Sequence, residues 1–104
     1  MHIVILITTK DQEEARKIAD KLVEEKLIAC ANIITDIRSV FWWDGKVNQE
    51  PEALMILKST KDQFQKITAT VKKLHSYECP EVIALPIELG NPDYLRWIDD
   101  SMKG

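Results

Sequence analysis

The sequence predicts an α+β domain in which two β-α units share a β-hairpin. Apolar runs rich in β-branched residues alternate with segments whose apolar residues recur every three or four positions, the pattern of strands followed by helices. A strong hairpin signal, Asp44-Gly45, falls between the two units. The resulting order is β-α-β-β-α-β plus a carboxy-terminal helix. This is the split β-α-β, or ferredoxin-like, arrangement, with an antiparallel sheet and both helices on one face.

The composition predicts one domain over residues 1–104. The length is near the commonest domain size, and no Pro-, Gly- or Ser-rich stretch divides the chain. Apolar residues make up 45% of the chain and charged residues 30%, a balance that provides both a buried core and a solvated surface.

The first strand and helix follow from hydrophobic periodicity. Ile3 to Ile7 is a continuous apolar run, typical of a central strand covered on both faces. Either Thr9 with Gln12 or Asp11 with Glu14 has the spacing that caps the first turn of a helix. The inward stripe of this helix is Ala15, Ile18, Ala19, Leu22 and Val23.

The central hairpin is predicted to be unusually long. Strand character begins in residues 27–34 and continues to Trp43, and the return strand runs from Lys46 to Lys58. Pro51 cannot donate to a strand ladder, so we expect a bulge or an edge there. A strand over residues 28–43 spans about 50 Å, whereas a domain of this size is roughly 33 Å across. The hairpin must therefore bend or overhang.

The second half of the chain repeats the strand and helix signals. Thr60 with Gln63 is predicted to cap a helix that ends near Leu74, and residues 75–80 form the loop after it. Val82 to Ile87 is predicted as a strand, and Pro86 marks its edge or its end.

A last short helix closes the chain. Asn91 is placed as its cap and Pro92 at its first position. The residues expected to point inward from it are Tyr94, Trp97, Ile98 and Met102.

The aromatic end of the hairpin predicts self-association. Phe41, Trp42 and Trp43 are adjacent, so they point to both faces of the ribbon, and a two-stranded ribbon cannot bury both. Such a cluster usually packs against another copy, which predicts a homo-oligomer with these residues and Trp97 at its interface. The alternative is that the aromatics fold back onto their own domain beneath the last helix.

Charge and motif content disfavour several classes of function. A net charge of −3 disfavours nucleic acid and anionic membranes as partners, and residues 48–52 lack the basic and aromatic side chains that stack RNA bases. The apolar amino terminus is too short for a signal peptide or a membrane span, so we expect a cytoplasmic protein. The spacing shows no Ser-His or Cys-His arrangement, and we expect no enzyme activity.

Five segments, in order, resemble the CutA divalent-cation tolerance family. They are residues 27–32 (LIACAN), 42–46 (WWDGK), 56–60 (ILKST), 74–80 (LHSYECP) and 93–97 (DYLRW). The resemblance implies a ferredoxin-like subunit in a tight trimer whose long hairpins reach onto neighbouring subunits. It also implies a role in tolerance of divalent metal ions, copper above all, with no established reaction.

The loop after the second helix holds the candidate metal ligands. His75, Cys79 and Glu81 combine an imidazole, a thiol and a carboxylate, which together suit copper or zinc. The alternative for His75 is a cap of the preceding helix. Cys30 is a weaker candidate, expected to pack beneath the first helix. No cofactor is expected to be obligatory, and the expected ligand is copper or another divalent ion.

The family resemblance also implies a copper ligand set that this chain retains only in part. That set joins a Cys at the end of the first strand to a His-His pair in the loop, and the matching positions here hold Ile7, Leu74 and His75. We expect Cys79 to substitute, with three copies completing the shell near a trimer axis or interface.

A second hypothesis places a ligand cleft between subunits. Lys58, Tyr77 and Trp43 offer a cation, a phenol and an aromatic wall to a small anionic ligand. The alternative makes Lys58 a solvated strand end and Tyr77 a structural hydrogen bonder. The predicted function is a non-enzymatic homotrimer that binds or responds to metal ions, and the alternative is a trimeric small-molecule sensing or signalling module.

Overall fold

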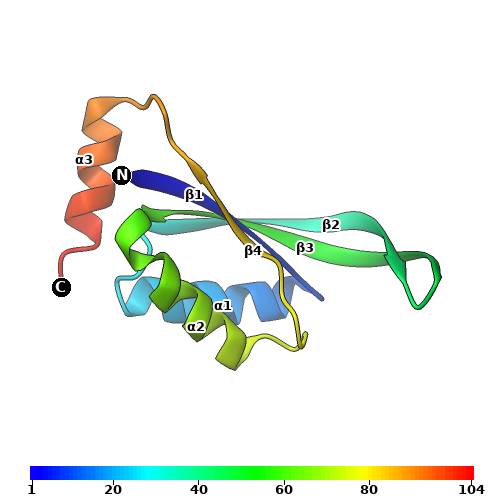
Figure 1. Ribbon diagram of the computed structural model, residues 1–104. Coiled ribbons are helices and arrows are strands. Elements are labelled where there is room, and N and C mark those ends of the chain that lie inside the picture. Colours follow the sequence, from blue (N-terminus) through cyan, green and yellow to red (C-terminus); the bar gives the residue numbers. More distant parts are fainter.

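The computed structural model describes residues 1–104 and confirms the α+β fold (Figure 1). Its four strands form one antiparallel sheet in the order β2-β3-β1-β4, the order of a split β-α-β fold. A single 3₁₀ turn, Lys61–Gln63, leads into the second helix. The elements are β1 His2–Thr9, α1 Gln12–Glu24, β2 Cys30–Trp43, β3 Lys46–Thr60, α2 Phe64–Leu74, β4 Val82–Pro86 and α3 Pro92–Ser101.

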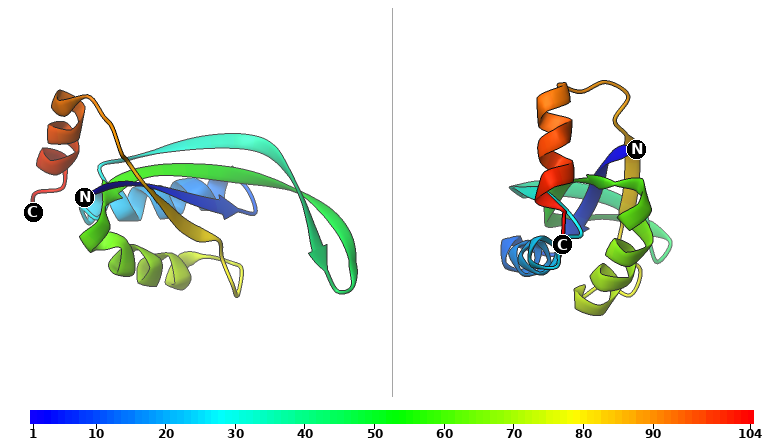
Figure 2. Two further views of the ribbon diagram at one scale, coloured as in Figure 1. Left: turned by 45° about the horizontal axis from the view of Figure 1, so that its top comes forward. Right: turned by 90° about the vertical axis from the view of Figure 1, so that its left-hand side faces the viewer.

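One face of the sheet carries the core. Helices α1 and α2 both lie beneath this face, side by side in Figures 1 and 2. Alternate side chains of β1 and β3 are buried against the helices, as the two-residue period of a strand requires. The core residues are Ile3, Ile5, Ile7, Ala15, Ile18, Ala19, Leu22, Ile28, Ala53, Met55, Leu57, Ile67 and Val71.

The other face of the sheet is apolar and largely uncovered. We call it the open face, and it consists of Val4, Leu6, Ile34, Leu54, Ile56, Ile83 and Leu85. The β1 members are only half-buried, and Ile83 and Leu85 are about half exposed, at 50% and 53%. The prediction that the Ile3 to Ile7 strand is covered on both faces is therefore wrong within a single chain.

Helix α3 packs across one end of the sheet, where β1 begins and β3 ends (Figure 2). Its only buried residue is Ile98, and Ser59 Oγ lies 3.9 Å from Met102 Sδ. Tyr94 and Trp97 stack on each other and stay 43% and 45% exposed, so the prediction that they point inward is wrong within one chain. None of the helices is long and apolar enough to cross a membrane.

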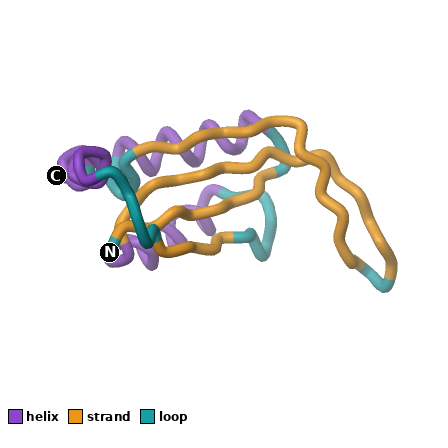
Figure 3. Tube along the Cα trace, turned by 90° about the horizontal axis from the view of Figure 1, so that it is seen from above, coloured by secondary structure: helices purple, strands orange, loops and turns teal.

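The hairpin of β2 and β3 both bends and overhangs, as its length predicted. The molecule measures 45 × 27 × 22 Å, and Figure 3 shows the hairpin turning away from the rest of the sheet. The bend coincides with a bulge, because Ile34 pairs with Leu54 and the next pair is Ile37 with Glu52. Two residues of β2, the second of them Asp36 with a φ of 60°, thus oppose one residue of β3.

Pro51 lies in the overhanging part of β3, just past the bulge. It pairs with Arg38, and its other side has no neighbouring strand because β1 ends opposite Ala53. The predicted edge is confirmed. The bulge lies in the partner strand, because a Pro on a free edge leaves the β2 ladder undisturbed.

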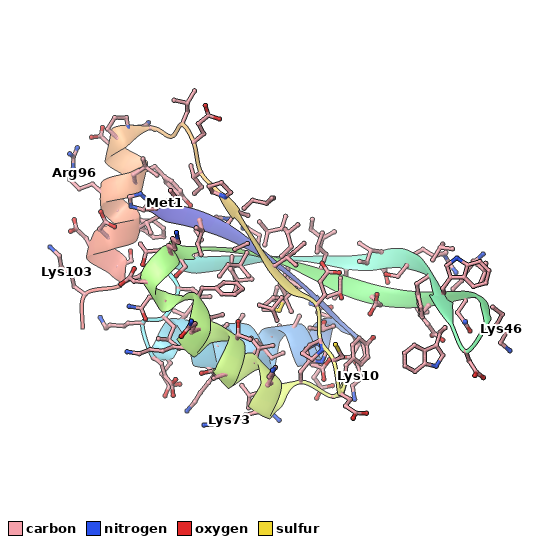
Figure 4. All side chains as sticks on the ribbon, in the orientation of Figure 1. Met1, Lys10, Lys46, Lys73, Arg96 and Lys103 are labelled. Carbon is pink, nitrogen blue, oxygen red and sulfur yellow. The ribbon has the colours of Figure 1, made fainter.

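The end of the hairpin projects away from the domain. Asp44 and Gly45 both have positive φ, 54° and 74°, which is the geometry of a two-residue hairpin turn. Trp42 and Trp43 are 74% and 70% exposed, and Phe41 is also exposed. In Figure 4, Lys46 marks this end, opposite the α3 end marked by Arg96 and Lys103. The aromatics therefore do not fold back beneath the last helix.

The amino termini of the three helices can be compared with the capping residues that the sequence predicts. Asp11 caps α1 by accepting from the Glu14 N–H at 2.8 Å, so the Asp11 with Glu14 alternative is confirmed. Asn91 caps α3 in the same way, with Pro92 at the first position, as predicted. The predicted cap by Thr60 and Gln63 is wrong, because the 3₁₀ turn intervenes and neither side chain caps α2.

Candidate functional site

The loop after α2 is tied to the start of α1 through one carboxylate. Glu14 accepts from the backbone N–H of Ser76 at 2.8 Å and from that of Lys10 at 3.1 Å. Burial opposes ionisation, but the hydrogen bonds from Ser76 and Lys10, together with nearby His75, lower the pKa of Glu14 overall. Glu14 is therefore a buried anion held by several donors. The Asp11 with Glu14 capping signal identifies Glu14 in the sequence, but it does not predict that the carboxylate also binds the loop after α2.

His75 uses both of its ring nitrogens within the protein. Nε2 lies 2.7 Å from the Thr8 carbonyl oxygen, and Nδ1 lies 3.0 Å from the backbone N of Tyr77. A carbonyl can only accept and a backbone N–H can only donate, so the proton is on Nε2. The side chain is fully buried, and Nδ1 is 3.8 Å from Glu14. The predicted first metal ligand therefore has no free lone pair in this structure.

The capping alternative for His75 is confirmed for its position and backbone, since it is the C-cap residue of α2, but not for its ring. The residue stands at the end of α2, and its backbone N–H bonds to Val71, but its ring bonds to β1 rather than to the last carbonyls of its own helix. The ring therefore joins β1 to the loop, a contact between residues 67 positions apart.

Tyr77 anchors the same loop to the hairpin. Its hydroxyl donates to Glu52 at 2.6 Å, and its ring packs on His75 with centroids 4.7 Å apart. Burial, the bond to Glu52 and the negative charges of Glu14 and Glu50 raise the pKa of Tyr77 well above its ordinary value. The Tyr77 hydroxyl already donates its one hydrogen bond to Glu52, and acidic residues surround it. It is therefore a poor partner for an anionic ligand. Its geometry matches the structural alternative.

The remaining metal candidates do not meet. Cys79 is exposed as a free thiol, and Glu81 is exposed beside it in sequence. Ile7, at the position of the family's strand Cys, is fully buried in the core, and Leu74 packs against that core. No three His, Cys, Asp or Glu side chains lie close enough to share an ion. A single chain thus does not assemble the predicted site.

Cys30 lies on the face of the sheet opposite the one predicted. It pairs with Lys58, whose neighbours Leu57 and Ser59 are the residues that face the helices. Its Sγ is 3.7 Å from the Tyr94 hydroxyl of α3, a contact that raises the pKa of Tyr94. The prediction that Cys30 packs beneath the first helix is wrong, because strand register places it on the open side.

The three residues of the predicted cleft lie far apart in one chain. Lys58 and Glu52, which holds Tyr77, are six positions apart on β3, or about 20 Å. Trp43 lies further away still, at the end of the hairpin. Only contacts between copies could bring these side chains together.

Lys58 has a distinct setting of its own. Its Nζ donates to the Asn32 Oδ1 across the hairpin, and Val4 and Cys30 are its direct neighbours on β1 and β2. This pairing was missed from the sequence, because the bond between Asn32 and Lys58 depends on the hairpin register.

A shallow groove of about 380 Å³ runs between α1 and β2 and contains none of the predicted site residues. Its lining combines four apolar residues with charged residues of both signs. The lining residues are Arg16, Ala19, Asp20, Val23, Glu24, Ala31 and Ile33.

Comparison with known proteins gives consistent results. Residues 3–101 match the family model described as CutA1 divalent ion tolerance protein. The divalent-cation tolerance protein CutA of Thermus thermophilus is 45% identical over 97% of this chain and 98% of its own length. The chloroplastic protein CutA 1 of rice is 43% identical over 97% of this chain, which spans only 57% of that relative.

Solved structures agree with the sequence relatives. The structure of the periplasmic divalent cation tolerance protein CutA from Archaeoglobus fulgidus has a TM-score of 0.96 and 44% identity, covering 99% of this chain and 100% of that one. The rice CutA1 crystal structure has a TM-score of 0.95 and 42% identity, covering 98% and 94%. The chain therefore belongs to the CutA1 divalent ion tolerance protein family.

Proposed function

We propose that this chain forms a homotrimer that binds or responds to divalent metal ions, copper first, and contributes to metal tolerance without catalysing a reaction. The observation that carries the proposal is the uncovered, apolar open face in a member of a divalent ion tolerance family. The trimer itself follows from the family resemblance, and the surface of the chain supports association of copies.

The open face and the hairpin end supply the surface for assembly. Both are apolar and accessible in a single chain, and contiguous apolar surface of this kind usually marks a protein contact. The edge strands β2 and β4 leave further backbone groups available for pairing. A hairpin that extends beyond its own domain is suited to contact a neighbouring copy.

The geometry points to Cys79 as the metal anchor in place of His75. The imidazole is buried and hydrogen-bonded, whereas the thiol is exposed and two residues from Glu81. Thiolate is a soft ligand that suits copper, particularly as Cu(I), and zinc. One chain offers too few donors, so the proposed shell is shared between copies.

A non-enzymatic role in the cytoplasm fits the side chains that are available. Both nitrogens of His75 are engaged within the protein, which leaves that imidazole without a free nitrogen to act as an acid or base. The two cysteines are free thiols, the state that a reducing compartment maintains. We propose no obligatory cofactor.

Native mass spectrometry with graded copper under reducing conditions tests both parts of the proposal. We expect a trimer that takes up copper, loss of uptake in Cys79→Ser, and retained uptake in the matched control Cys30→Ser. A monomer would refute the assembly. A trimer whose uptake is unchanged in Cys79→Ser would refute the proposed anchor.

A second candidate function is a small-molecule sensing module with ligand sites between subunits. Tyr77 does not support it, because its hydroxyl already donates to Glu52. The observation in its favour is Lys58, a cation on the apolar side of the sheet that forms no ion pair within the chain.

A further inference from the structure

Lys58 is the only Lys, Arg, Asp or Glu on the open side of the sheet where β1 pairs with β3, near the end at which β2 begins. Its direct neighbours on that side are the aliphatic side chains of Val4 and Ile56 and the thiol of Cys30. The five ion pairs of the chain involve other residues, and the partner of Lys58 is the neutral amide of Asn32. Its charge is therefore uncompensated within one chain.

An uncompensated ammonium is tolerated on this surface only while water reaches it. When a second copy covers the open face, the water is displaced, and a buried charge without a counter-charge strongly opposes association. The covered face therefore requires an anion close to Nζ. The Lys58 side chain is half-buried already and its Nζ donates to Asn32, so the ammonium lies at the surface that a second copy would cover.

We propose that Lys58 and Asn32 form a binding site for a small aliphatic monocarboxylate in the assembled protein. This inference rests on the proposed assembly. The Asn32 oxygen accepts from Lys58, which leaves the amide NH₂ and the remaining ammonium hydrogens as donors. The site thus presents only donors, and it prefers an anion.

The surroundings of the site define the class of anion. One lysine balances one negative charge, whereas phosphate esters are usually held by several cations or by an arginine fork. Val4 and Ile56 flank the ammonium with aliphatic surface, which favours a short hydrocarbon chain on the ligand. These two requirements together describe a carboxylate such as butyrate.

A carboxylate side chain of the second copy would satisfy the same chemistry. The experiment therefore separates the two sources. Native mass spectrometry gives the number of subunits, and thermal unfolding is followed with butyrate, with phosphate and with chloride at equal ionic strength. The variants are Lys58→Met, Asn32→Asp, and Lys72→Met, which removes an exposed lysine from α2 as a matched control.

The proposal gives a distinct result for each variant. Wild type and Lys72→Met should be stabilised by butyrate in a saturable way, and more than by phosphate or chloride. Lys58→Met should lose at least tenfold in apparent affinity for butyrate. Asn32→Asp places a carboxylate beside Lys58, so its trimer should be stable without butyrate and insensitive to it.

Three outcomes would overturn the proposal. An equal butyrate response in wild type and Lys58→Met would show that the anion binds elsewhere. A trimer that ignores butyrate and dissociates in Lys58→Met would assign the counter-charge to the second copy. Either result is compatible with a wild-type trimer and refutes only the carboxylate site, whereas a wild-type monomer would refute the assembly and the site together.

Discussion

The two faces of the sheet have the same kinds of residue but different surroundings. The covered face packs Ile5, Met55 and Leu57 against two helices until they are fully buried, whereas the open face leaves Leu6, Ile56 and Leu85 without a helix. Both faces are aliphatic, so composition does not distinguish them. A single chain therefore buries only one of the two apolar faces of its sheet. The apolar character of the other face is explained only by a partner that covers it.

Truncating one residue on each face should give the sharpest contrast. Leu57→Ala on the covered face should lower the free energy of unfolding by about 2–5 kcal/mol at every protein concentration, because it leaves a cavity in a core that cannot collapse fully. Its neighbour Ile56→Ala should act mainly through assembly, so its effect should grow at low protein concentration. Urea unfolding at several concentrations measures both, and two equal, concentration-independent losses would contradict the comparison.

On the covered side of the sheet, Glu14 joins the start of α1 to the loop after α2, and this contact should make the free energy of unfolding depend on pH. The pKa of Glu14 is lowered in the folded chain, so its contribution is complete above its unfolded value of about 4.3 and is lost as pH falls through the lower folded value. Glu14→Gln should cost about 1–3 kcal/mol at pH 7.

The difference between wild type and Glu14→Gln should shrink as the pH falls from about 5 toward 3. Thermal unfolding across this range measures it, with Glu13→Gln as an exposed control on the same helix turn. A difference that stays constant with pH would mean that the ionised carboxylate is not what holds the loop.

The smallest effect is expected at the loop anchor. Tyr77→Phe removes the hydrogen bond to Glu52 and should cost about 1 kcal/mol, with faster hydrogen exchange confined to residues 75–81. Tyr94→Phe, at a half-exposed phenol on the α3 side, should change stability by less than about 0.5 kcal/mol. Equal effects would show that the loop gains nothing from Tyr77.

Sequence periodicity predicted the elements well because burial on the helix side repeats at regular intervals. Strand pairing was harder, since the face on which Cys30 lies depends on its register with Lys58. The prediction of a metal site at His75 was wrong for a similar reason. Spacing brought His75 near Cys79, but the ring turns toward Thr8, a residue 67 positions away that no local pattern connects to it.

The apolar run from Ile3 to Ile7 illustrates a further limit. Its composition predicts cover on both sides of the strand, and the chain supplies cover on one. Hydrophobic pattern does not distinguish burial within a chain from burial between chains. The number of copies that meet there therefore stays a prediction.

The extra residue in β2 between Ile34 and Ile37 also sets the phase of everything beyond it. Before it, odd-numbered residues such as Ala31 share a side with the buried Leu57; after it, odd-numbered residues such as Phe41 pair with the opposite set. Deleting Asp36 would restore a uniform alternation along β2 and leave Trp42 opposite Val47, so it should remove the bend of the hairpin without changing the pairing beyond it. Between Ile34 and Ile37, the number of residues matters more than their identity, because it sets the direction in which the end of the hairpin points. Homologous chains should therefore vary in sequence at the bulge but not in length.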